Sequence, residues 1–258
     1  MAKNEYRSLL KHIMEIGPCA IALSGGADSA FLLHAAREAL GENLLAVSVA
    51  FPYSLSRDRN ATEDLARFLG VRLKRLSMPL PESMARNPEN RCYLCKKAMM
   101  TAIRDDAVSE GFETVVDGTN GDDDASRRPG MAALRQLGIR SPLRECAIGK
   151  PAVRRYLSRF GLDALIRQSD TCLLTRLPCD TEVNIEELKK IEGAEDLLLS
   201  LGFHDVRVRK HGTLARIEVR RKDRNRLFSA PVEDVLVGKL KESGFDRITV
   251  DVEGYREK

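Results

Sequence analysis

The sequence contains no tryptophan, and aromatic side chains make up only 5% of its 258 residues. Proteins that read single-stranded RNA stack bases on aromatic rings, and no RNA-binding motif is recognisable here, so this scarcity argues against a nucleic-acid partner. No apolar run approaches the length of a membrane span, and the N-terminus lacks the layout of a signal peptide. We therefore expect a globular, cytoplasmic protein without a membrane partner.

Charge of neither sign dominates the chain. Its 42 Lys and Arg residues are interspersed with 38 Asp and Glu residues, and the net charge is +4. This balance is compatible with small anionic ligands but does not by itself indicate nucleic-acid binding. Six cysteines without a secretion signal indicate reduced thiols, metal ligands or reactive groups rather than a disulfide scaffold.

The most informative stretch is a glycine turn, Ser24-Gly25-Gly26-Ala27-Asp28-Ser29, between an apolar run at 19–23 and a helix-like run at 30–40. Adjacent glycines let backbone N–H groups converge on an anion, and the following helix directs its positive end to the same point. Ser24 and Ser29 add hydroxyl donors, while Asp28 can cap the helix or help to hold Mg²⁺. The pattern is neither a Walker loop nor a dinucleotide fingerprint. It favours a phosphate-binding loop over an ordinary strand-to-helix turn.

Short apolar runs alternate with longer amphipathic ones through the first two thirds of the chain. This rhythm predicts a doubly wound α/β fold with a parallel sheet, in which ligands bind at the carboxyl ends of the strands, where Ser24–Ser29 lies. We expect strands at 19–23, 44–51, 71–76 and 114–116, and helices at 5–16, 28–40, 57–69, 91–110 and 150–160.

The last third has a different pattern, which predicts a small α+β domain. A helix at 186–201 is followed by a hairpin around His211-Gly212, a helix at 232–243 and a strand at 247–252. We therefore predict a nucleotide-binding domain at 1–165, a linker with Cys172 at 166–183, and a substrate-binding or oligomerisation domain at 184–258. We expect the protein to be a homo-oligomer.

Several motifs outside the glycine turn each have two interpretations. Cys92 and Cys95 form a Cys-x-x-Cys pair, which is half of a metal or cluster site, a redox pair or two buried thiols. The Asp/Asn/Gly cluster at 117–124 is a solvated turn or helps to place a nucleotide and Mg²⁺. The proline-rich segment 78–91 is expected to be an exposed, mobile loop.

Two further features lie after the predicted sheet. Taken alone, Cys172 is more often an inert buried thiol than a nucleophile. Arg207 and Arg209 lie on one face of a strand, opposite Glu218 on its partner, and are either solvated or suited to bind a substrate phosphate.

The glycine turn resembles the PP-loop of the ATP pyrophosphatases, and the ordered set of motifs resembles the LarE family of ATP-dependent sulfur transferases over nearly the full length. These enzymes make the nickel-pincer nucleotide cofactor of lactate racemase. The motifs that carry the resemblance are 24–29, 91–97, 117–120, 128–130, 140–143, 171–172 with 176–178, and 201–209.

The resemblance implies the PP-loop fold of the adenine-nucleotide α-hydrolase type, and it implies ATP with Mg²⁺. A carboxylate of pyridinium-3,5-dicarboxylate mononucleotide would be adenylated and converted to a thiocarboxylate. By resemblance, ATP and pyrophosphate are bound by Ser24, Gly25, Gly26, Asp28, Ser29 and Gly118, with adenine near 50–51. Cys172 matches the sulfur-bearing cysteine, Arg176 and Glu195 the catalytic cluster, and Arg207 and Arg209 the substrate-phosphate site.

Sulfur delivery takes two forms in such families. In the sacrificial form the cysteine gives up its own sulfur and becomes dehydroalanine. In the other form three cysteines hold a [4Fe-4S] cluster, and Cys92, Cys95 and Cys172 supply that number, which favours the cluster. The sequence departs from the family at Cys179-Asp180, where Tyr-Gly is usual. Cys179 is a fourth ligand, a persulfide carrier or, the interpretation we favour, a small buried residue.

Two alternative functions remain open at this point. The first is tRNA thiolation, because related PP-loop enzymes adenylate a base and use three-cysteine clusters. The second is a non-catalytic, ATP-binding regulatory protein. A synthetase of the NAD or GMP type would need an ammonia source, and the chain has no glutaminase domain.

Overall fold

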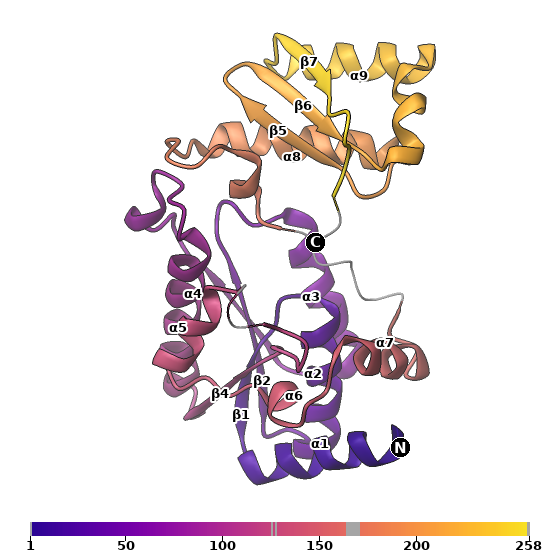
Figure 1. Cartoon of the computed structure of the whole chain (residues 1–258). Helices are drawn as coiled ribbons and strands as arrows, with labels where there is room; N and C mark the ends of the chain where they lie inside the picture. The colour runs from indigo at the N-terminus through magenta and orange to yellow at the C-terminus, as the bar shows by residue number, and fades with distance from the viewer. Residues whose placement is uncertain (1, 125, 127, 164–170, 257–258) are drawn as a thin grey trace. The chain divides into compact units, whose positions relative to one another are not determined.

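The computed structural model describes residues 2–124, 126, 128–163 and 171–256 (Figure 1). Contacts divide the chain into two compact units. The first comprises Met1–Met84 and Asn90–Asp170, and the second comprises Ala85–Glu89 and Thr171–Lys258. No described helix is both long and apolar enough to cross a membrane.

The first unit is built on a four-stranded parallel sheet with the order β3-β2-β1-β4. Its strands are β1 (Cys19–Ala22), β2 (Leu44–Ala50), β3 (Leu73–Ser77) and β4 (Thr114–Asp117). The chain starts at β1, adds β2 and β3 on one side and then crosses to place β4 on the other. The reversal creates a switch point between β1 and β4, and in open α/β sheets ligands bind there.

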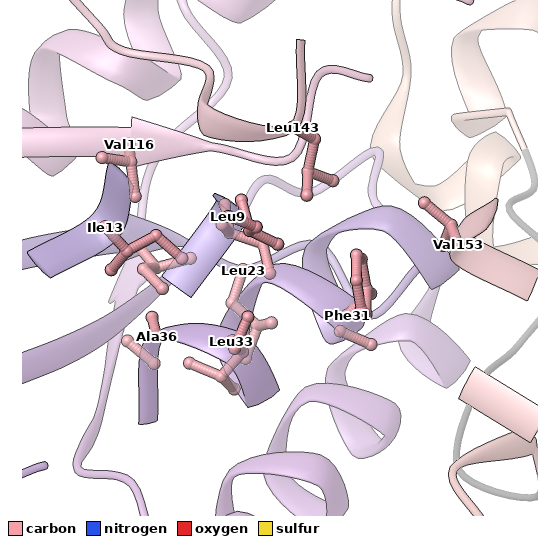
Figure 2. Packing of buried hydrophobic residues seen from close by; sticks show 14 of the residues in the cluster. Leu9, Ile13, Leu23, Phe31, Leu33, Ala36, Val116, Leu143 and Val153 are labelled. Atoms are coloured by element: carbon pink, nitrogen blue, oxygen red, sulfur yellow. The ribbon is translucent and has the colours of Figure 1, made fainter. Parts of the chain in front are cut away.

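Helices cover both faces of this sheet. They are α1 (Ala2–Ile16), α2 (Ala27–Leu40), α3 (Ser56–Leu69), α4 (Arg91–Ser109), α5 (Gly130–Gln136), α6 (Pro142–Glu145) and α7 (Lys150–Arg159). On one face, Leu9 of α1, Phe31 of α2 and Val153 of α7 pack in one buried cluster with Leu23 (Figure 2). Ile21 of β1 belongs to the same cluster. Residues of α4 and α5 cover the other face and bury Ala20, Ala22 and Val47 there. The doubly wound α/β prediction is therefore confirmed.

The second unit is a small α+β structure. The antiparallel hairpin of β5 (Arg207–His211) and β6 (Leu214–Glu218) is extended by a parallel strand, β7 (Arg247–Val250). Helix α8 (Ile185–Ser200) packs on β5, and Asn184 caps its N-terminus by accepting hydrogen bonds from the N–H groups of Glu186 and Glu187. A 3₁₀ segment, η4 (Arg221–Phe228), leads into helix α9 (Ala230–Glu242). The predicted hairpin, helices and last strand are confirmed.

The structure differs from expectation where elements are short. The 3₁₀ turns η1 (Glu82–Met84) and η3 (Leu173–Arg176), and also α6, were not predicted, because three or four residues are too few to show a hydrophobic period. The expectation of an exposed loop at 78–91 is wrong at Met84 and Asn87, which are both buried. Of the predicted linker, residues 166–170 lie outside the described residues, and the chain from Thr171 onward belongs to the second unit.

Candidate active site

The glycine turn joins the carboxyl end of β1 to the first turn of α2. Gly25 has a φ of +79°, and a Cβ added there would lie 3.3 Å from the carbonyl oxygen of Asp58. The hydroxyl of Ser29 donates to the carbonyl oxygen of Gly26 at 3.0 Å and lies 3.1 Å from the hydroxyl of Ser24. The two serines therefore shape the turn, and the N-terminal end of α2 supplies N–H groups and a positive dipole for an anion.

A cavity of about 1000 Å³ opens beside this turn and is lined by the carboxyl ends of all four strands. Its apolar wall comes from Val49, Ala50, Leu76, Met99 and Ile103, and its polar side includes Ser24, Asp28 and Ser29. The volume is at the upper end of the usual range for ligand pockets, roughly 300–1000 Å³. A nucleoside triphosphate fits this division, because its base matches the apolar wall and its phosphates match the turn.

Carboxylates and cations share the polar side of the cavity. Asp28 accepts a hydrogen bond from the Asn120 side chain at 3.0 Å. Burial raises the pKa of Asp28, and the nearby Asp123 adds to this effect, whereas the bond from Asn120 opposes it. The buried Asp123 pairs with Arg128 at 3.0 Å. Among the described residues, no group of three or more His, Cys, Asp or Glu side chains is arranged to hold a metal.

The carboxylates of Asp28 and Asp123 are hard oxygen donors of the kind that Mg²⁺ uses, and both line the cavity. Mg²⁺ at enzyme sites usually takes one or two carboxylates and completes its shell with water and substrate phosphates. These two residues therefore fit a magnesium ion that arrives with a nucleotide.

Gly118 allows the end of β4 to approach α2 closely. A Cβ at this position would lie 2.8 Å from the backbone nitrogen of Ser29 and 2.9 Å from its Cα. Real Cβ atoms do not make such contacts with backbone, so only glycine fits here. Gly118 also lines the cavity, together with five of the six residues of the glycine turn, the exception being Gly25.

The Cys-x-x-Cys pair lies in the first turn of α4. Cys92 is exposed and Cys95 is half-buried, and the hydroxyl of the buried Tyr53 donates to the Cys95 sulfur at 3.3 Å. Residues three apart on a helix lie on the same face, so the two thiols have the spacing needed to share one metal or cluster. By contrast, burial raises the pKa of Cys19 to about 12, which makes this thiol unreactive.

In the second unit, Cys172 precedes the 3₁₀ turn η3 and is partly exposed. Its carbonyl oxygen accepts hydrogen bonds from the backbone N–H of Thr175 at 3.1 Å and from the Thr175 hydroxyl at 2.9 Å. The guanidinium of Arg176 donates to the carbonyl of Thr171 at 2.7 Å and to the Thr171 hydroxyl at 2.6 Å. Hydrogen bonds therefore fix the backbone before and after Cys172.

A buried ion pair lies beneath this turn. Arg176 is 1% exposed and Glu195 is 0% exposed. The pair is bidentate, with Nε to Oε1 at 2.8 Å and Nη2 to Oε2 at 3.0 Å. Glu195 also accepts a hydrogen bond from the backbone N–H of Val208 in β5 at 3.1 Å. The pair thus joins the cysteine turn, α8 and β5.

The two predicted phosphate-binding arginines differ in their surroundings. Arg209 pairs with Glu218 and donates to the carbonyl of Thr175 at 2.7 Å. Arg207 is only 6% exposed, and its guanidinium lies 4.7 Å from the ring centroid of Tyr255. The Nε of Arg207 has no hydrogen-bond partner within the described chain. An unpaired buried guanidinium N–H is a feature that an anionic ligand satisfies.

Asn87 is a functional residue that the sequence analysis did not predict. This side chain is 0% exposed, and its amide donates to the carbonyl oxygens of Leu174, Leu177 and Pro178 at 3.1, 3.3 and 2.8 Å. Its partners lie 87 or more residues later in the chain, so no local pattern relates them. Asn87 therefore holds the backbone that follows Cys172.

Cys179 follows this clamped segment and is exposed. The interpretation of Cys179 as a small buried residue is wrong, because the next residue, Asp180, takes a φ of +57° and turns the chain at the surface. Its interpretations as a ligand or a persulfide carrier stay predictions.

The fold and the glycine turn define a PP-loop, ATP-utilising protein, and comparisons agree with this class. Residues 6–102 match the family model described as asparagine synthase. The chain is 34% identical to an uncharacterized protein of Synechocystis over 99% of this chain and 96% of the relative, and 32% identical to one of Methanocaldococcus jannaschii over 92% and 90%. It is 29% identical to pyridinium-3,5-bisthiocarboxylic acid mononucleotide synthase of Lactiplantibacillus plantarum over 96% and 91%. The chain belongs to the LarE family, which includes that synthase.

The close approach at Gly118 generates a prediction for ATP binding. Gly118→Ala places a methyl group against the backbone of Ser29, so we expect it to lower the free energy of unfolding by about 1–3 kcal/mol and to weaken ATP binding. Urea denaturation and calorimetric titration with ATP measure the two effects. Gly193→Ala is the matched control, because a Cβ there meets nothing within 4 Å. Wild-type stability and ATP affinity in Gly118→Ala would contradict the prediction.

The Asn87 clamp generates a second prediction. Asn87→Ala leaves three carbonyl oxygens without their shared donor, which should lower the free energy of unfolding by about 1–3 kcal/mol and loosen the segment after Cys172. We expect Cys172 to react faster with iodoacetamide, as followed by peptide mass spectrometry. Asn90→Ala is the control, because the Asn90 side chain is exposed and makes no capping bond. Equal alkylation rates in the two variants would show that the clamp does not restrain the turn.

Proposed function

We propose that this protein is an ATP-dependent sulfur transferase that adenylates a carboxylate of pyridinium-3,5-dicarboxylate mononucleotide and converts it to a thiocarboxylate. The observation that carries the proposal is the cavity of about 1000 Å³ over Ser24–Ser29 in a chain that is related over 96% of its length to a bisthiocarboxylate mononucleotide synthase. A cytoplasmic location and a homo-oligomeric state stay predictions of the sequence.

The first half-reaction uses the phosphate loop. A carboxylate oxygen of the substrate attacks the α-phosphorus of ATP, and the bond to the β-phosphate oxygen breaks with its electron pair leaving on pyrophosphate. Ser24, Gly25, Gly26 and Ser29 would hold that pyrophosphate through N–H and hydroxyl groups. Asp28 would hold Mg²⁺ on the phosphates, with Asp123 beside it. Gly118 would let the backbone approach the nucleotide.

The second half-reaction uses the cysteine turn. A sulfur nucleophile attacks the carbonyl carbon of the acyl adenylate, and AMP leaves with the electron pair of the broken C–O bond. In the sacrificial form the thiolate of Cys172 would be this nucleophile, and in the cluster form Cys172 would be a ligand of the cluster that supplies it. Arg207 offers its unpaired Nε to the substrate phosphate, with Arg209 next to it on the same strand face. We assign Arg176 and Glu195, which are fully buried, to holding the turn in the catalytic cluster.

Two sources of sulfur fit the described thiols. In the sacrificial form, the Cβ–S bond of Cys172 breaks by elimination of the Cα proton, which leaves dehydroalanine in the chain. In the form we propose, Cys92, Cys95 and Cys172 hold a [4Fe-4S] cluster, which when bound supplies the sulfide that is transferred. The pair at the start of α4, with Cys92 exposed and Cys95 half-buried, has the spacing for two of these ligands.

A Cys172→Ala variant tests the two half-reactions separately. We expect it to bind ATP and to release pyrophosphate with the mononucleotide, but to make at least 100-fold less thiocarboxylate, since activation does not need the thiol. A pyrophosphate assay and mass spectrometry of the mononucleotide measure the two products. Cys146→Ala, which removes a thiol in the first unit away from the cavity lining, is the control. Thiocarboxylate formation by Cys172→Ala at the wild-type rate would contradict the role of Cys172.

The sulfur source is tested by iron and sulfide analysis after anaerobic purification. We expect iron in the wild type and its loss in Cys92→Ser and Cys95→Ser, whereas Cys146→Ser should keep it. Iron-free wild-type protein in which Cys172 becomes dehydroalanine after one turnover would overturn the cluster form and support the sacrificial one.

A further inference from the structure

One cation in the nucleotide cavity is not explained by the phosphate loop or the cysteines. Lys96 follows Cys95 on α4 and lines the cavity. Its ammonium group lies 3.2 Å from the Oδ2 atom of Asp117, and its side chain is 27% exposed, compared with 4% for Asp117. The pair therefore joins a partly exposed cation to a buried carboxylate, and it holds the ammonium group at one place in the cavity.

Asp117 is a rigid anchor for this ammonium. Its Oδ1 accepts hydrogen bonds from the Ser141 hydroxyl at 2.7 Å and from the Thr119 backbone N–H at 3.2 Å, and its Oδ2 accepts one from the Thr119 hydroxyl at 2.8 Å. Both carboxylate oxygens are therefore fixed before the lysine binds. The lysine adds a fourth donor to a carboxylate that is already satisfied.

The position of Asp117 in the sheet places this anchor beside the phosphate loop. It is the last residue of β4 and is paired in register with Ala22, the last residue of β1, after which the loop begins. The next residue, Gly118, approaches the first turn of α2 closely enough to exclude a Cβ. Asp117 therefore holds a positive charge at the switch point where the nucleotide phosphates belong.

The stem of Lys96 is also confined. A Cβ added to Gly130, at the start of α5, would lie 3.2 Å from the Cβ of Lys96 and 3.3 Å from its Cγ. Close packing of α5 on the stem and the ion pair at the tip leave the ammonium little freedom. A lysine has three donors, and the described contacts use one of them for Asp117.

We propose that Lys96 is a catalytic residue of the adenylation step, which donates from its ammonium group to a non-bridging oxygen of the ATP α-phosphate, while Asp117 positions it. This inference rests on the proposed function. As the substrate oxygen bonds to the α-phosphorus and the bond to pyrophosphate breaks, negative charge accumulates on the phosphoryl oxygens and on the leaving group. A fixed cation stabilises this charge more in the transition state than in bound ATP.

The test compares two neighbouring lysines. Lys97 has the same charge and the same helix but is exposed, lies over the Tyr93 ring and does not line the cavity. We expect Lys96→Gln to lower the rate of pyrophosphate release from ATP and the mononucleotide by about 100-fold or more, with a much smaller change in the Kd for ATP. Lys97→Gln should keep the wild-type rate. Glutamine retains a donor for Asp117, and urea denaturation checks that the variant is folded.

Asp117→Asn tests whether Asp117 positions Lys96. It keeps the shape of the side chain but weakens the hold on the ammonium, so we expect a loss of about 10-fold in the rate, also with ATP affinity near the wild-type value. A rate in folded Lys96→Gln within about threefold of the wild type would overturn the inference. Wild-type protein that releases no pyrophosphate with this mononucleotide would instead contradict the proposed function, so the two failures are distinguishable.

Discussion

The nucleotide half of this protein depends on one close contact, the packing of the end of β4 against the first turn of α2. Only a residue without a Cβ fits between the strand end and the backbone of Ser29. Because that contact is made, the amides that open α2 and the carboxylate that ends β4 face the same cavity. A wider separation between β4 and α2 would place Asp117 away from the phosphate loop, and the cavity would no longer be closed on that side. The site is therefore a consequence of backbone packing before any side chain is considered.

The second unit holds the turn that contains Cys172 through a buried ion pair and contacts with β5. The Arg176–Glu195 pair is wholly buried, and burying two charges costs several kcal/mol per ion unless hydrogen bonds satisfy them. Here the guanidinium and the carboxylate are both satisfied by the pair itself and by backbone groups on either side of it. These hydrogen bonds offset the cost of desolvation, and the pair orders the turn that contains Cys172.

The sequence predicted the parts of this structure that follow from local patterns. Continuous apolar runs marked β1 and β2, because both faces of a parallel strand are buried, and Gly25-Gly26 marked the phosphate loop. The sequence did not predict features that depend on contacts between residues far apart in the chain. Asn87 is buried because its partners come from a segment far along the chain, and nothing in its neighbours indicates them. Arg176 and Glu195 are residue types that are usually exposed, so their burial follows only from the tertiary fold.

Three ion pairs in the two units share one feature, a carboxylate that is more buried than its cation. Arg128 pairs with Asp123, Lys96 with Asp117 and Arg209 with Glu218, and in each pair the carboxylate is more buried than the cation. A buried carboxylate held by other donors acts as a fixed counter-charge, so the cation keeps its position without a ligand. Binding of an anionic substrate then requires little reorganisation of the protein, which is the condition under which electrostatic stabilisation of a transition state is greatest. Arg207 pairs with no carboxylate in the described part of the chain and stacks on Tyr255 instead, which leaves its Nε available to a phosphate.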